Sequence, residues 1–105
     1  MNARAKEVLD NYIQIISALD GVLAIYLFGS HVHGTPNEQS DIDLMVIVED
    51  HLKVINTAYA INVALIGKKE VPLDILVNRQ SDFLDAVKDP SLQRHIMDEG
   101  VLVYG

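Results

Sequence analysis

Residues 26–49, with the sequence YLFGSHVHGTPNEQSDIDLMVIVE, decide the fold of this chain. The stretch begins inside an apolar run, residues 22–28, that predicts a strand, and Gly29 and Ser30 follow that run directly. Glycine lacks a Cβ atom and permits a sharp turn, and the Ser30 hydroxyl would stand beside free backbone N–H groups. The turn is therefore expected to form a small cradle for an anion.

Two carboxylates open the second apolar run of this stretch. Asp41 and Asp43 stand two residues apart, and residues i and i+2 of a strand point to the same face of the sheet. Two negative charges this close repel each other, so they require a divalent cation between them or a raised pKa. Magnesium together with a nucleotide would satisfy both the carboxylates and the anion cradle.

A third carboxylate lies in a later apolar run. Asp74 is the only charge within residues 71–77, VPLDILV, which predict another strand. A charge inside such a run needs a partner, so we expect Asp74 to join Asp41 and Asp43 at one end of the sheet, facing Ser30 across an open groove. Pro72 leaves a second possibility open, that Asp74 lies on an exposed edge strand.

The rest of the chain predicts helices around these strands. Apolar residues recur at helical spacing in residues 3–19 and 51–66, and shorter helices are predicted at 81–87 and 91–98, with an edge strand at 101–104. These elements predict a single α+β domain, residues 1–105, with a mixed β-sheet of three to four strands and helices packed mainly on one face.

Two predictions concern the helix interiors. Tyr12 lies on the apolar face of the first helix and is expected in the core. Five apolar residues at steps of three and four are expected to form the inward face of the second helix: Leu52, Ile55, Tyr59, Val63 and Ile66.

Charge and composition limit the classes of function. The chain has 15 acidic and 8 basic residues, a net charge of −7 and no cluster of Lys or Arg. This balance opposes stable binding to nucleic acid and favours a basic protein partner. No apolar run is long enough to span a membrane and no secretory signal is recognisable, so we expect a cytoplasmic protein. A homo-oligomer remains open.

The motifs and their spacing resemble those of the nucleotidyltransferase superfamily of DNA polymerase beta. More narrowly, the chain resembles the minimal nucleotidyltransferases, in which G-S-x-A-R-G is followed by S-D-x-D-L. Here the first motif reads GSHVHG at residues 29–34, and the second reads SDIDL at residues 40–44. His33 stands where the family has arginine, so a permanent cation is replaced by a side chain that is mostly neutral near pH 7.

The resemblance implies transfer of a nucleoside monophosphate, AMP from ATP, to a hydroxyl group with the help of two Mg²⁺ ions. The residues that would hold the metal ions and act catalytically are Asp41, Asp43 and Asp74. The residues that would bind the nucleotide phosphates are Gly29, Ser30, His33 and Ser40. For His31 and His33 themselves, a phosphate or acceptor contact and a transition-metal site are both open.

Three functions remain open at this point. The first is an enzyme that adenylylates a protein or a small molecule. The second is a binding module that neutralises a partner, because the resemblance extends to antitoxins paired with HEPN-domain toxins, which are ribonucleases. The third is an antibiotic-modifying nucleotidyltransferase. Under the first two, the implied partner is a HEPN-type toxin, and a tyrosine of that toxin is the expected hydroxyl acceptor.

Overall fold

The computed structural model describes residues 2–32 and 41–105. The elements, in chain order, are α1 (Ala3–Ser17), β1 (Val22–Phe28), the 3₁₀ turn η1 (Gly29–His31), β2 (Ile42–Val48), α2 (Val54–Ala64), β3 (Leu73–Arg79), α3 (Gln80–Ala86), α4 (Leu92–Glu99) and β4 (Val101–Tyr104). The predicted strands at 22–28 and 101–104 are both present. In the described part of the chain, no helix is long and apolar enough to cross a membrane.

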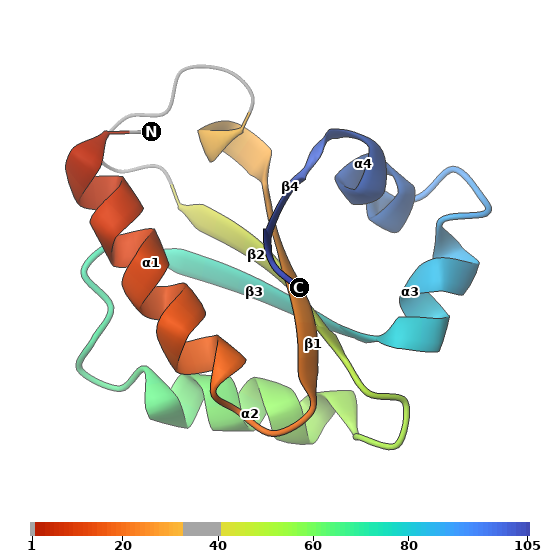
Figure 1. The fold of residues 1–105 in the computed structure, drawn as a ribbon, viewed down its shortest axis with the longest axis horizontal. Coiled ribbons are helices and arrows are strands. Elements are labelled where there is room, and N and C mark those ends of the chain that lie inside the picture. The colour runs from red at the N-terminus through yellow and green to blue at the C-terminus, as the bar shows by residue number, and fades with distance from the viewer. Residues whose placement is uncertain (1, 33–40) are drawn as a thin grey trace.

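The four strands form one mixed sheet in the order β3-β2-β1-β4. Strand β1 runs antiparallel to both β2 and β4, whereas β2 and β3 are parallel and are joined through α2 (Figure 1). A parallel pair needs such a crossover connection because a short turn cannot return the chain to the same end of the sheet. The predicted α+β fold with a mixed sheet is confirmed.

The larger hydrophobic core lies between one face of the sheet and the two longer helices, α1 and α2. Four residues of β2 point into it and are almost completely buried: Ile42, Leu44, Val46 and Val48. From α1 it receives Val8, Leu9, Tyr12 and Ile16, and from α2 it receives Ile61. This packing fixes β2, the strand that carries Asp43, at the centre of the domain.

A smaller core covers part of the opposite face. Met45 and Ile47 alternate with the residues of the first core along β2 and pack against Phe83 of α3 and Ile96 of α4. Tyr26 of β1 stacks on Phe83 with ring centroids 5.7 Å apart. The longer helices therefore lie on one face as expected, and the two short helices add a second layer on the other.

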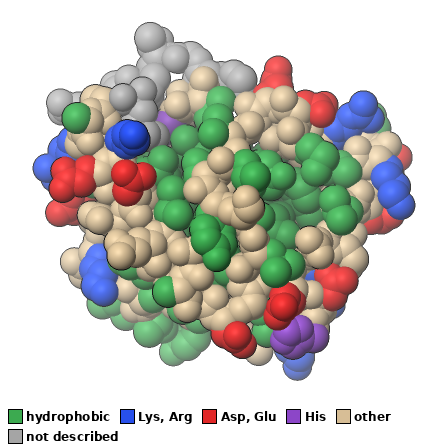
Figure 2. Space-filling view, viewed as in Figure 1, with side chains coloured by type: hydrophobic (Ala, Val, Ile, Leu, Met, Phe, Trp, Pro, Cys, Tyr) green, Lys and Arg blue, Asp and Glu red, His purple; other side chains and the backbone are tan. Residues whose placement is uncertain are grey.

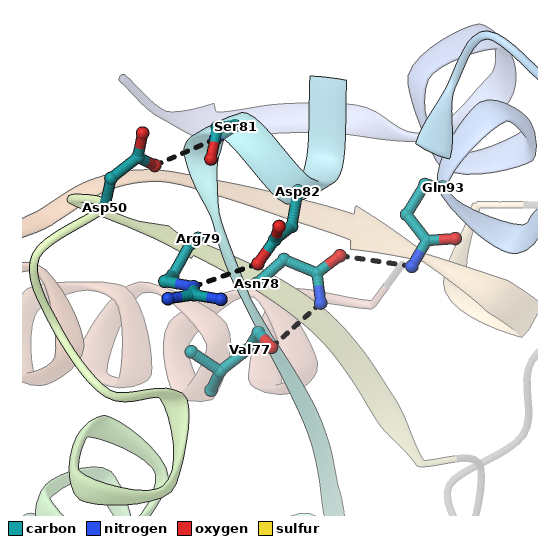
Figure 3. Close-up of polar contacts among 7 residues, drawn as sticks. All are labelled: Asp50, Val77, Asn78, Arg79, Ser81, Asp82 and Gln93. Carbon is teal, nitrogen blue, oxygen red and sulfur yellow. Dashed lines mark hydrogen bonds and ion pairs between the residues drawn. The ribbon is translucent and has the colours of Figure 1, made fainter. Parts of the chain in front are cut away.

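Polar contacts hold the two short helices at the carboxyl end of β3 (Figure 3). The backbone N–H of Ser81, in the first turn of α3, donates to Asp50 Oδ1 over 2.9 Å. Gln93 Nε2 of α4 donates to Asn78 Oδ1 over 3.1 Å. These contacts lie at the end of the strand away from Asp74, so they support the fold at a distance from the three carboxylates.

The face of α2 that packs on the sheet differs from the prediction. Ile55, Tyr59 and Ile66 are 74%, 71% and 73% exposed, whereas Thr57 and Ile61 are buried. The expected core position of Tyr59 is therefore wrong, while that of Tyr12 is confirmed. Helix α2 carries apolar residues on most of its circumference, so their spacing could not indicate which side faces the sheet.

These exposed side chains leave an apolar surface on α2. The lower edge of Figure 2 shows hydrophobic side chains gathered where α2 lies in Figure 1. The residues that contribute to it, and that were expected inside, are Ile55, Tyr59 and Val63 of α2 and Ile66 just after the helix ends.

Candidate active site

Two of the predicted site residues come from neighbouring strands. Asp43 and Asp74 are register partners in the parallel pair β2–β3, so their side chains leave the same face of the sheet. Neighbouring strands lie about 4.8 Å apart, which places the two carboxylates side by side. Asp41 precedes β2 by one residue and is exposed, as is Asp74. The prediction that Asp43 and Asp74 come together is therefore met by the strand register.

The electrostatics of Asp43 reflect this crowding. Partial burial raises the pKa of the Asp43 carboxyl, and the negative charges of Asp74 and then of Asp41 raise that pKa further. His31 acts in the opposite direction and lowers it. Asp74 and Asp41 thus lie within electrostatic range of Asp43, together with the imidazole of His31 from the turn after β1. Repulsion of this kind is relieved by a bound cation.

Gly29 lets the turn after β1 approach Asp43. Its φ of +82° lies in the left-handed region, and a Cβ atom built on it would stand 3.1 Å from Cγ of Asp43 and closer still to Oδ2. Any side chain at position 29 would therefore displace the Asp43 carboxylate. Ser30 follows in η1 and is exposed, so its hydroxyl is accessible to a ligand beside the carboxylates.

Two predicted phosphate-binding residues, His33 and Ser40, lie outside the described residues. The structure places Gly29 against Asp43 and brings Asp41 and Asp74 within electrostatic range of Asp43. Ser30 follows Gly29 in η1. The sequence left a phosphate or acceptor contact and a transition-metal site both open for His31. The electrostatic effect of His31 on Asp43 places it at the same site.

This set of carboxylate oxygens fits a magnesium ion that is bound jointly by the protein and by a substrate phosphate. Among residues 2–32 and 41–105, no group of three His, Cys, Asp or Glu side chains is arranged to hold a metal ion by itself. Magnesium usually retains water and substrate phosphate oxygens and takes only one or two carboxylates from the protein. The mutual repulsion at Asp43 and the exposed neighbouring carboxylates suit an ion that arrives with a phosphate ligand.

Comparison with known families identifies the class of protein. The family described as "Polymerase beta, Nucleotidyltransferase" matches residues 10–105, which is most of the chain. The chain therefore belongs to the polymerase beta nucleotidyltransferase family, as its motifs predict. No curated protein matches the chain significantly.

Solved structures share the fold at low sequence identity. A crystal structure of a toxin-antitoxin with AMP-PNP has a TM-score of 0.61 at 22% identity, covering 95% of this chain and 73% of that chain. A mutant of the toxin-antitoxin MntA-HpeT has a TM-score of 0.59 at 18% identity, covering 100% and 74%. A protein from Shewanella oneidensis has a TM-score of 0.55 at 20% identity, covering 100% and 73%. At these identities the likeness shows the fold alone.

Proposed function

We propose that this protein is a magnesium-dependent nucleotidyltransferase that transfers AMP from ATP to a hydroxyl group of a partner protein. The observation that carries the proposal is the pairing of Asp43 with Asp74 in the β2–β3 register, beside a turn whose glycine leaves no room for a side chain. Family membership supports the reaction class. The residues assigned to the chemistry are Asp41, Asp43 and Asp74.

Each residue has a separate role in this proposal. Asp41 and Asp43, with Asp74 beside them, would hold two magnesium ions, which supply charge neutralisation at the triphosphate and at the attacking and leaving oxygens. Ser30 and the backbone after Gly29 would hold the β- and γ-phosphates in register. His33 and Ser40 are assigned to the same phosphates through their motif positions.

The reaction is a single in-line displacement. The acceptor hydroxyl oxygen attacks the α-phosphorus of ATP and forms a new P–O ester bond. The bond from the α-phosphorus to the bridging oxygen breaks, and pyrophosphate leaves with that oxygen and its electron pair. The hydroxyl proton passes to the Asp74 carboxylate. Because Asp74 is exposed, the proton can then exchange with solvent.

The proposed acceptor is a tyrosine of a HEPN-type toxin, for which this protein would act as the antitoxin. Two observations support this choice. The net charge of −7 suits a basic, RNA-cleaving partner. Two toxin-antitoxin structures share the fold, and one of them is described with AMP-PNP.

The experiment is an intact-mass measurement of a purified HEPN toxin after incubation with this protein, ATP and magnesium. The expected result is a mass gain of one or more adenylyl groups on the toxin. Asp41→Asn should abolish the gain, and Asp85→Asn, on the exposed surface of α3, should preserve it. The absence of any gain with the wild-type protein, in a mixture that still forms a tight complex, would contradict the transfer reaction.

A pure binding antitoxin is the second candidate. One observation favours it: His33 replaces the arginine of the motif, so a permanent phosphate-pairing cation is missing at that position. For this candidate, the toxin should be inhibited equally by the wild-type protein and by Asp41→Asn, with no requirement for ATP. Restoration of the motif by His33→Arg should then create or increase transfer.

A further inference from the structure

Tyr12 makes a buried polar contact that connects α1 to the start of β3. The residue is 1% exposed, and its hydroxyl donates to the carbonyl oxygen of Val71 over 2.6 Å. The backbone N–H of Val71 donates back to the same hydroxyl oxygen over 3.3 Å. One side chain therefore satisfies both backbone groups of a residue 59 positions away in the sequence.

The backbone after Val71 leads directly to the carboxylates. Pro72 has no N–H to donate, but its carbonyl accepts a 2.8 Å hydrogen bond from the N–H of Ile42, the residue between Asp41 and Asp43. Asp74 follows two residues after Pro72 and faces Asp43. The Tyr12 hydroxyl thus holds the segment that aligns the two strands where both carboxylates leave the sheet.

We propose that Tyr12 is a positioning residue for the pair Asp43–Asp74, and the proposal rests on the nucleotidyltransferase function given above. Strand pairing is sensitive to alignment, because a shift of one residue would turn the Asp74 side chain to the opposite face of the sheet. Pro72 removes one possible backbone donor just before β3. The Tyr12 hydroxyl instead binds the backbone of Val71, the residue before Pro72, and so sets the position of Asp74 opposite Asp43.

The loss of this hydroxyl has a local consequence. Tyr12→Phe keeps the ring in the core but removes the partner that the N–H and C=O groups of Val71 have among residues 2–32 and 41–105. The start of β3 then loosens, and the Ile42–Pro72 hydrogen bond opens more often. The distance between the carboxylates of Asp43 and Asp74 would vary, so a magnesium–nucleotide ligand would bind a smaller fraction of molecules.

A matched control separates positioning from general stability. Ile16 is buried in the same helix and the same core, and no hydrogen bond connects its side chain to β3. Ile16→Val removes one methyl group and lowers stability but leaves both Tyr12–Val71 hydrogen bonds in place. Both variants are compared with the wild type at a temperature well below their thermal midpoints, where each is fully folded.

The first measurement is amide hydrogen exchange by NMR, which needs no ligand. In Tyr12→Phe, the amides of Val71 and Ile42 should exchange at least about tenfold faster than in the wild type, while those of β1 stay protected. In Ile16→Val, these two amides should change no more than the other core amides. If the amides of Val71 and Ile42 exchange no faster in Tyr12→Phe than in Ile16→Val, the proposal is overturned, whatever the activity of the protein.

The second measurement is the affinity for magnesium with AMP-PNP by calorimetry. The wild type should bind, Ile16→Val should bind equally well, and Tyr12→Phe should bind about three- to tenfold more weakly. Equal affinity in Tyr12→Phe and the wild type would overturn the positioning role. No binding by the wild type would instead contradict the proposed function, because it is the function that requires the nucleotide.

Discussion

Asp43 of β2 and Asp74 of β3 are direct register partners in the one parallel strand pair among the described residues. Because the chain crosses over through α2 between them, residues 31 positions apart meet on one face of the sheet. Asp43 is partly buried and Asp74 is exposed, so the two carboxylates of this pair differ in their access to solvent.

Magnesium with ATP should stabilise the folded protein. A ligand that binds only the native state raises the free energy of unfolding by about 2.7 kcal/mol at a concentration of 100 times its Kd. The thermal midpoint should therefore rise with millimolar magnesium and ATP, and Asp43→Ala should remove the rise. Asp85→Ala, an exposed change on α3, serves as the control and should retain it. A shift that persists in Asp43→Ala would place the ligand elsewhere.

Without divalent ions, Asp43→Asn should be more stable than the wild type at neutral pH. Burial and the charges of Asp74 and Asp41 raise the pKa of Asp43 in the folded state. The folded state therefore holds this proton more tightly, and wild-type stability falls as pH rises from about 3.9, the unfolded value, through the folded pKa. The advantage of Asp43→Asn should grow over that pH window and then level off. Denaturant unfolding at several pH values measures the difference in the free energy of unfolding between Asp43→Asn and the wild type. A difference that does not change with pH would contradict the electrostatic account.

Gly29→Ala should be far more damaging than Gly67→Ala. Both glycines have positive φ, +82° and +74°, so each substitution strains the backbone by about 1–2 kcal/mol. At Gly29 the added Cβ also meets the Asp43 carboxylate, whereas at Gly67 nothing lies within 4 Å. We expect Gly29→Ala to lower the free energy of unfolding by roughly a further 1–3 kcal/mol. It should also abolish the nucleotide-dependent rise in the thermal midpoint. Similar losses in the two variants would show that the close approach to Asp43 has little effect.

The two sides of α2 should respond differently to truncation. Ile61 is fully buried, so Ile61→Ala should lower the free energy of unfolding by about 2–5 kcal/mol. Ile55 is 74% exposed, so Ile55→Ala should change it by no more than about 0.5 kcal/mol. Chemical denaturation of both variants gives the comparison. A large loss in Ile55→Ala would mean that this face of α2 is covered in solution.

Much of the fold could be predicted because local and global signals agree. Residues 22–28 are uniformly apolar and end at a glycine, and they form β1 with those limits. Along β2, Ile42 and Leu44 point into the larger core and Asp43 between them points to the other face, because a strand places successive residues on opposite faces.

The inward side of α2 could not be predicted from spacing. Ile55 and Ile61 have the same side chain, and only the tertiary arrangement decides that Ile61 packs on the sheet and Ile55 faces solvent. The partnership of Tyr12 with Val71 was equally inaccessible, because hydrogen bonds between distant residues leave no local pattern. At the site, the sequence indicated the carboxylates, whereas the close approach of Gly29 to Asp43 depends on how η1 packs against β2 and leaves no local pattern.

The most direct test of the central claim is to locate the metal–nucleotide site by paramagnetic NMR. Manganese replaces magnesium in oxygen-rich sites and broadens the signals of nearby amides. With manganese and AMP-PNP, we expect selective broadening at Ser30, Ile42, Asp43 and Asp74, and its reversal by excess magnesium. Broadening confined to the acidic surface of α3 and α4, around Asp85 and Asp98, would contradict the assignment of these carboxylates to a nucleotide site.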